Sequence, residues 1–212
     1  MAGIRRKLGT APASKKAPVG DGELAALIAT LGEDLSGLRD RALLTLGWSS
    51  ACRRSELVAL DVADVELQVE GLLVHVRRSK GDQEAKGYDK GIPYASAPAL
   101  CAVRALQAWL DAAGITEGAI FRGVDRYGHV SKTRLSDRSV ARIVQRAASA
   151  AGLDPSRYGG HSLRSGFMTT AAEKGRPLEA IMRQTGHKSE RVARGYIQHA
   201  TVFKNNPAKG LV

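Results

Sequence analysis

Short apolar runs separated by turn residues fill the stretch that decides the fold class. This stretch spans residues 62–94 and reads VADVELQVEGLLVHVRRSKGDQEAKGYDKGIPY. The apolar residues in 62–69, in 72–78 and at 92–94 favour short strands. Glu70 and Gly71 separate the first two runs, and the polar segment 81–91 separates the second from the third. We therefore predict a small antiparallel sheet.

Helices are predicted on both sides of this sheet. Asp21 can cap a helix that ends at Leu31, and Ser36 can cap a second whose apolar residues follow helical spacing. The other predicted helices cover residues 53–60, 97–113, 136–151, 162–173, 177–184 and 189–197. Gly114 and Gly152 follow two of them as stop signals. The order of helices, small sheet and helices predicts a mostly helical α+β domain.

The net charge points to a polyanionic partner. The chain carries 32 lysines and arginines against 21 acids, a formal charge of +11. The excess lies at the two ends, because residues 1–20 hold five basic groups without an acid and residues 157–212 hold ten against three. We expect nucleic acid as the partner, although basic tails can also be solubilising segments.

Other compositional features narrow the setting. The two cysteines, Cys52 and Cys101, are far apart and lack metal-site spacing, so neither a disulfide framework nor a zinc site is indicated. No apolar stretch is long enough for a membrane helix. We expect a soluble cytoplasmic protein associated with the nucleoid, with no cofactor and no metal. Asp61, Asp64 and Glu66 could surround Mg²⁺, but solvated carboxylates at strand ends are the more common case.

Four local clusters carry chemistry-bearing residues at the edges of predicted elements. The first three are Arg53 with Glu56 at a helix start, Lys80 at the end of a strand, and His161 with Arg164 at the start of a helix. The fourth joins His187, which follows Gly186, to Tyr196 near the end of a cationic helix. An arginine at a positive helix terminus favours a bound anion. Taken singly, each cluster also fits a surface ion pair, a capping histidine or a core aromatic.

Taken in order, these clusters resemble the tyrosine site-specific recombinase family, of the phage integrase type. That family has R-x-x-E-L, then a hairpin lysine, then H-x-L-R, then G-H-x-S with a tyrosine about nine residues after the histidine. The resemblance implies a catalytic domain over residues 21–204, preceded by a basic arm at 1–20 and followed by a tail at 205–212. It implies six catalytic residues: Arg53, Lys80, His161, Arg164, His187 and Tyr196.

The resemblance also implies a reaction that needs neither metal nor ATP. Tyr196 would attack a DNA phosphodiester, His161 would serve as base, and Lys80 would protonate the leaving 5′ oxygen. Both arginines and His187 would hold the nonbridging oxygens. The product would be a 3′-phosphotyrosyl link, and strand exchange would imply a homotetramer on DNA, while a monomer is plausible in isolation.

Two alternatives stay open at this point. One is a strand cleaver like the type IB topoisomerases, which relaxes supercoils as a monomer. The other is a noncatalytic DNA-binding fragment of the same fold. The sequence departs from the commoner family pattern in having Arg-Ser-Gly after Leu163. It also begins at what looks like the linker after an N-terminal helical domain that family members usually have.

Overall fold

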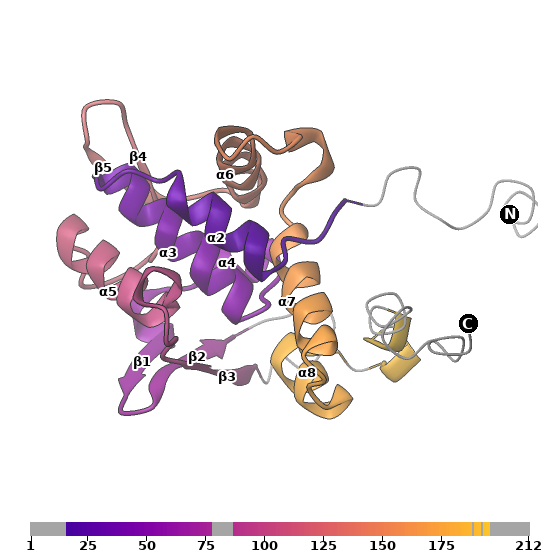
Figure 1. Cartoon of the computed structure of the whole chain (residues 1–212). Helices are drawn as coiled ribbons and strands as arrows, with labels where there is room; N and C mark the ends of the chain where they lie inside the picture. The colour runs from indigo at the N-terminus through magenta and orange to yellow at the C-terminus, as the bar shows by residue number, and fades with distance from the viewer. Residues whose placement is uncertain (1–15, 78–86, 188, 192, 196–212) are drawn as a thin grey trace, which may run out of the picture.

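The computed structural model describes residues 16–77, 87–187, 189–191 and 193–195. In this part of the chain more residues lie in helices than in the two small antiparallel sheets (Figure 1). The α-helices are α2 (Asp21–Ala29), α3 (Leu35–Ser49), α4 (Arg54–Ala59), α5 (Ala102–Ala113), α6 (Asp137–Ala150), α7 (Ser162–Glu173) and α8 (Leu178–Thr185). The strands are β1 (Val65–Gln68), β2 (Gly71–Val76), β3 (Tyr88–Pro93), β4 (Arg122–Val124) and β5 (Val130–Arg134). The predicted α+β class is confirmed.

Helix α3 forms the centre of the domain. Its residues Ala42, Leu43, Leu44 and Leu46 are fully buried, and they pack in one apolar core with residues of α2, α5 and α6. The Asp34 side chain begins the helix by accepting a hydrogen bond from the Gly37 amide at 3.0 Å. The sequence had favoured Ser36 as the cap, and that prediction was wrong because the helix starts one residue before the serine.

The predicted small sheet is present, in the order β1-β2-β3 with both pairs antiparallel. Its first run, which the sequence assigned entirely to a strand, begins as a 3-10 turn at Val62–Asp64 before β1. Strand β3 begins beside α8, at the lower edge of the view in Figure 1, and runs away from it toward the β1–β2 turn. The sheet therefore brings the segment after the β2–β3 connection close to the C-terminal helices.

Helices α6 and α7 are tied to the rest of the domain by a polar and an aromatic contact. The buried Asp40 of α3 accepts hydrogen bonds from Arg39 and from Arg146 of α6. Helix α7 packs on α3, where the rings of Trp48 and Phe167 meet edge to face at 5.6 Å between centroids. These contacts fix the element that carries the H-x-L-R motif against the helix that precedes the first arginine.

Residues 16–20 lie against the folded domain. The Val19 amide donates to the Ser162 carbonyl at 2.9 Å, and the Trp48 indole donates to the Val19 carbonyl at 2.9 Å. A β-carbon at Gly166 would stand 1.7 Å from the Val19 carbonyl oxygen. Glycine at position 166 is thus what lets this segment pass directly over α7. Within the described residues, no helix combines the length and apolar character needed to cross a membrane.

Candidate active site

Arg53 stands at the start of α4, immediately after the corner that joins α3 to α4. Its backbone amide donates to Glu56 Oε2 at 2.9 Å, and its guanidinium donates to Glu56 Oε1 at 2.5 Å. The Glu56 side chain is only 3% exposed, whereas that of Arg53 is 29% exposed. A buried carboxylate thus holds both the backbone amide and the guanidinium of Arg53, whose side chain still reaches the surface.

Arg164 lies on the first turn of α7 and is 1% exposed. Its Nη1 donates to the Ala51 carbonyl at 2.6 Å, and its Nη2 contacts His187 Nε2 at 3.2 Å. Burial and the nearby positive charge of Arg53 lower the pKa of the Arg164 guanidinium. The fold therefore keeps a second positive charge close to Arg53, although the two charges repel each other and one is buried. A bound anion would reduce this unfavourable energy.

His187 follows the left-handed Gly186, which ends α8 with φ of +68°. Its Nδ1 lies 2.8 Å from Thr185 Oγ1, and the Thr185 hydroxyl itself donates to the Ile181 carbonyl at 2.8 Å. An arginine side chain can only donate, so His187 Nε2 must accept from Arg164 and Nδ1 must carry the proton. In this arrangement the imidazole orients Arg164 and has no free N–H to give to a phosphate.

The surroundings of His187 disfavour its charged form. Burial, followed by the positive charges of Arg164 and Arg53, lowers the pKa of His187 to about 4 from the ordinary value of 6.5. The histidine is therefore neutral at neutral pH. A phosphate placed between these groups would raise this pKa, because its negative charge favours the imidazolium.

The stability of the chain should decrease on acidification because of His187. Its pKa is lower in the folded chain, so the unfolded chain takes up a proton as the pH falls from about 6.5 to about 4 and the folded chain does not. His187→Gln should make this loss of stability smaller, as measured by urea unfolding across that pH range. His129→Gln, at an exposed histidine of the β4–β5 turn, is the matched control. Equal pH dependence in wild type and His187→Gln would contradict the assignment.

His161 is exposed and occupies the N-cap position of α7, one turn before Arg164. A positive charge on His161 would also lower the pKa of His187, so these three motif residues share one electrostatic environment. The structure thus brings together four of the six predicted residues: Arg53, His161, Arg164 and His187. The other two, Lys80 and Tyr196, lie outside the described residues.

The base of the β2–β3 connection is anchored by ion pairs. Arg77, just after β2, pairs with Asp61 and with Asp64 at 2.7 Å each, and Arg134 of β5 pairs with Asp61 at 2.7 Å. These two carboxylates belong to the group that the sequence considered for Mg²⁺. Both are engaged by arginines here, and they fix the point from which the segment with Lys80 departs.

The sequence did not single out two further residues beside the arginines, Lys90 and Tyr88 of β3. Lys90 is 2% exposed, and its Nζ donates to the Ser50 carbonyl at 2.7 Å. The Tyr88 hydroxyl is buried with no hydrogen-bond partner among the described residues, and burial raises its pKa. A β-carbon at Gly186 would stand 2.7 Å from this hydroxyl, so glycine is needed there for space as well as for φ.

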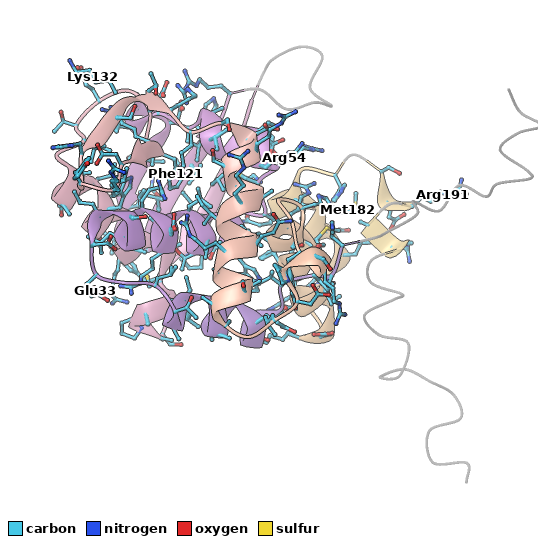
Figure 2. All side chains as sticks on the ribbon, turned by 90° about the horizontal axis from the view of Figure 1, so that it is seen from above. Glu33, Arg54, Phe121, Lys132, Met182 and Arg191 are labelled. Atoms are coloured by element: carbon cyan, nitrogen blue, oxygen red, sulfur yellow. The ribbon has the colours of Figure 1, made fainter. Side chains whose placement is uncertain are left out.

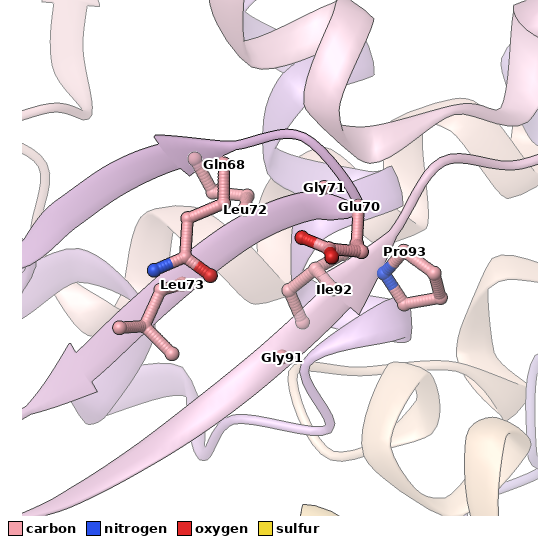
Figure 3. A pocket seen from close by; sticks show the side chains of 8 residues that line it. All are labelled: Gln68, Glu70, Gly71, Leu72, Leu73, Gly91, Ile92 and Pro93. Carbon is pink, nitrogen blue, oxygen red and sulfur yellow. The ribbon is translucent and has the colours of Figure 1, made fainter.

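A surface pocket lies at the opposite end of the sheet, around the β1–β2 turn (Figure 3). Its lining is mostly apolar: Gln68, Glu70, Gly71, Leu72, Leu73, Gly91, Ile92 and Pro93. It contains none of the motif residues and no cation. The arginine cluster is thus distinct from this pocket.

Residues 21–202 match the phage integrase family. The chain belongs to this family. A relative from Selenomonas ruminantium, named integrase/recombinase xerD homolog, is 45% identical over 97% of this chain and 60% of its own length. The tyrosine recombinase XerC of Syntrophus aciditrophicus is 34% identical over 74% of this chain and 48% of its own length.

Solved structures show the same fold for this phage integrase family member. XerH site-specific recombinase, in a post-cleavage complex with palindromic difH substrate, superimposes with a TM-score of 0.71 at 20% identity, over 92% of this chain and 53% of XerH. XerA recombinase superimposes with a TM-score of 0.66 at 21% identity, over 94% of this chain and 66% of XerA. The chain spans about half to two thirds of the length of these proteins.

Proposed function

We propose that this chain is the catalytic part of a site-specific DNA recombinase that cuts and rejoins DNA through Tyr196. The supporting observation is the cluster of Arg53, Arg164 and His187 around the α3–α4 corner in a member of the phage integrase family. Its partner is double-stranded DNA, and it acts as a homotetramer in the cytoplasm, on the nucleoid. The domain comprises residues 21–204, between the basic arm 1–20 and the tail 205–212.

The two arginines supply the positive charge that the reaction needs. A phosphodiester resists attack because its negative charge repels a nucleophile. Arg53 reaches the surface, and the buried Arg164 is near enough to feel its charge, so we expect both guanidinium groups to bind the nonbridging oxygens of one phosphate. The incoming anion would compete with His187 for Arg164, and it would raise the pKa of His187 so that Nε2 can also donate.

Proton transfer is assigned to three residues. The Tyr196 oxygen forms a bond to phosphorus while its proton passes to His161, and the bond from phosphorus to the 5′ oxygen breaks as Lys80 protonates that oxygen. The products are a 3′-phosphotyrosyl link and a free 5′ hydroxyl. The link keeps the energy of the broken bond, so the reverse sequence rejoins DNA without ATP or a metal.

A capture experiment tests this function. Nicked fragments of genomic DNA from the organism that carries the gene are mixed with the chain in EDTA, denatured with SDS and recovered through the attached protein. We expect covalently bound fragments that share one sequence, because a nick beside the cut lets the short 5′ strand diffuse away and traps the intermediate. Absence of protein-linked DNA would contradict the proposal. Plasmid relaxation by the monomer without strand exchange would favour the topoisomerase alternative.

A further inference from the structure

Three consecutive backbone carbonyls at the C-terminal end of α3 each accept a hydrogen bond from a different element. The donors come from α8, β3 and α7, three segments that are far apart in the sequence. The pairs are Gln184 Nε2 to Ser49 at 2.9 Å, Lys90 Nζ to Ser50 at 2.7 Å, and Arg164 Nη1 to Ala51 at 2.6 Å. The corner between α3 and α4 is thus held from three sides.

The end of a helix is a suitable place for such donors. The last carbonyls of an α-helix have no partner within the helix and carry the negative end of its dipole, which favours cations there. Ala51 adds a second reason, because its φ of +49° is in the left-handed region that favours glycine. A strained backbone conformation persists only where the surrounding structure holds it in place. Here Lys90 binds the carbonyl just before Ala51, and Arg164 binds the carbonyl of Ala51 itself.

The burial of Lys90 is costly for the fold. Desolvation lowers the pKa of its ammonium group, the nearby charge of Arg164 lowers it further, and Cys52 and Glu56 oppose these effects. Replacing a buried ion pair by apolar side chains of similar volume is often neutral or stabilising, so a buried charge is weak evidence of a gain in stability. A lysine that is 2% exposed in an otherwise apolar strand face therefore suggests a role in the reaction rather than in stability.

We propose that Lys90 is a positioning residue for the arginines that bind the phosphate, acting through the Ser50 carbonyl, with Gln184 supporting the same corner from α8. Arg53 follows Ser50 by three residues, and Arg164 binds the carbonyl between them. Lys90 fixes the backbone path from which Arg53 projects and against which Arg164 is placed. Gln184 also donates to the Gly91 carbonyl at 3.3 Å, so it links β3, α3 and α8, the helix that precedes His187. The inference rests on the proposed function.

The main test is the Lys90→Met variant, which keeps an unbranched side chain one atom shorter and removes the donor and the charge. The rate of adduct formation is measured in a single turnover, at saturating concentration, on a nicked duplex that carries the captured site. We expect a rate about 100-fold lower than that of wild type, because small displacements of positioned groups cost rates of this order. Affinity for DNA should stay nearly unchanged, since Lys90 is buried beneath the site.

Lys132→Met is the matched control. Lys132 is an exposed lysine of β5, at the opposite end of the molecule from Met182 of α8 in Figure 2. This variant loses the same charge and should cleave at the wild-type rate. Wild-type cleavage by Lys90→Met would overturn the inference and leave the proposed function intact. Absence of an adduct with wild-type protein would instead contradict the proposed function.

Modified substrates separate positioning from direct proton transfer. A methylphosphonate at the cleaved position removes the negative charge that the arginines neutralise. On this substrate the loss of cleavage rate in Lys90→Met should therefore be smaller, and the same should hold for an Arg164 variant. A 5′-bridging sulfur leaves without protonation, so it should rescue Lys80→Met and leave the Lys90→Met defect in place. Rescue of Lys90→Met by sulfur would assign Lys90 as the proton donor and overturn the positioning role.

Hydrogen exchange provides a readout that does not depend on activity. The Arg53 amide is bonded to Glu56, so its exchange reports opening of the corner. In Lys90→Met this amide should exchange faster than in wild type or in Lys132→Met, while the exchange rates of the α5 amides stay unchanged. If Lys90→Met fails to fold, the half-buried Gln184 provides a second test of the same corner. We expect the Arg53 amide of Gln184→Met to exchange faster than in wild type, by a smaller factor. Unchanged exchange in the folded variants would overturn the inference.

Discussion

The Tyr196→Phe variant should form no detectable covalent adduct with DNA that the unchanged chain labels fully. The substitution removes the phenolic oxygen, which is the only atom that joins protein to phosphorus in the proposed intermediate, and it keeps the aromatic ring. Binding of intact DNA should persist, because the arginine cluster and the positive net charge are unchanged. Denaturing gel electrophoresis of the chain with end-labelled nicked duplex measures the adduct, and band shift under native conditions measures binding.

Tyr127→Phe is the control for this experiment. Tyr127 is 69% exposed in the β4–β5 turn, where Arg126 Cζ lies over its ring, 4.7 Å from the centroid. Its variant loses the same oxygen and should label DNA at the wild-type rate. Tyr88 is a poor substitute nucleophile, since burial raises the pKa of its hydroxyl. A normal adduct yield from Tyr196→Phe would show that another group attacks the phosphate.

The sequence predicted the family and the fold class because its signals there are local, and two pairs of its candidate site residues lie close together for the same reason. Arg53 and Glu56 are three residues apart at a helix start, and that spacing alone places a carboxylate beside the guanidinium. His161 and Arg164 likewise follow from helical spacing. The burial of Arg164 could not be predicted, because it depends on Ala51 and His187, which reach it from distant parts of the chain.

Lys90 shows where a local signal existed and was overlooked. In a strand, residues two apart face the same side, so Lys90 shares a face with Tyr88 and Ile92. Ile92 is 1% exposed, and the alternation therefore points Lys90 into the interior. The polar residues around it predict a connection over residues 81–91 instead, whereas the structure begins β3 at Tyr88.

The β4–β5 hairpin was missed for a different reason. Its strands, Arg-Gly-Val and Val-Ser-Lys-Thr-Arg, hold few apolar residues and lie largely at the surface. A half-exposed pair of this kind has no alternation that the sequence could show. Its position is set by tertiary contacts instead, such as the bond from Arg134 Nη1 to the Val58 carbonyl at 2.8 Å.

Arg164 combines more functions than a lysine could replace. Its planar guanidinium binds the Ala51 carbonyl through one nitrogen and His187 through another, and it keeps further N–H groups for a phosphate oxygen. The shorter lysine is a single point charge on a flexible stem. It can serve one of these partners, so the corner, the imidazole and the phosphate would compete for it.

The Arg164→Lys variant should therefore cleave nicked DNA about 10²- to 10³-fold more slowly at saturating concentration, which is the usual cost of losing one donor to a developing oxyanion. Its affinity for DNA should fall much less, since Arg164 is buried and the exposed cations remain. Single-turnover rates and binding curves on the same duplex separate the two effects. Arg183→Lys, at an exposed arginine on α8, is the matched control and should cleave normally. A rate near that of wild type for Arg164→Lys would mean that positive charge alone suffices at this position, and the paired hydrogen bonds of the guanidinium would then have no part in catalysis.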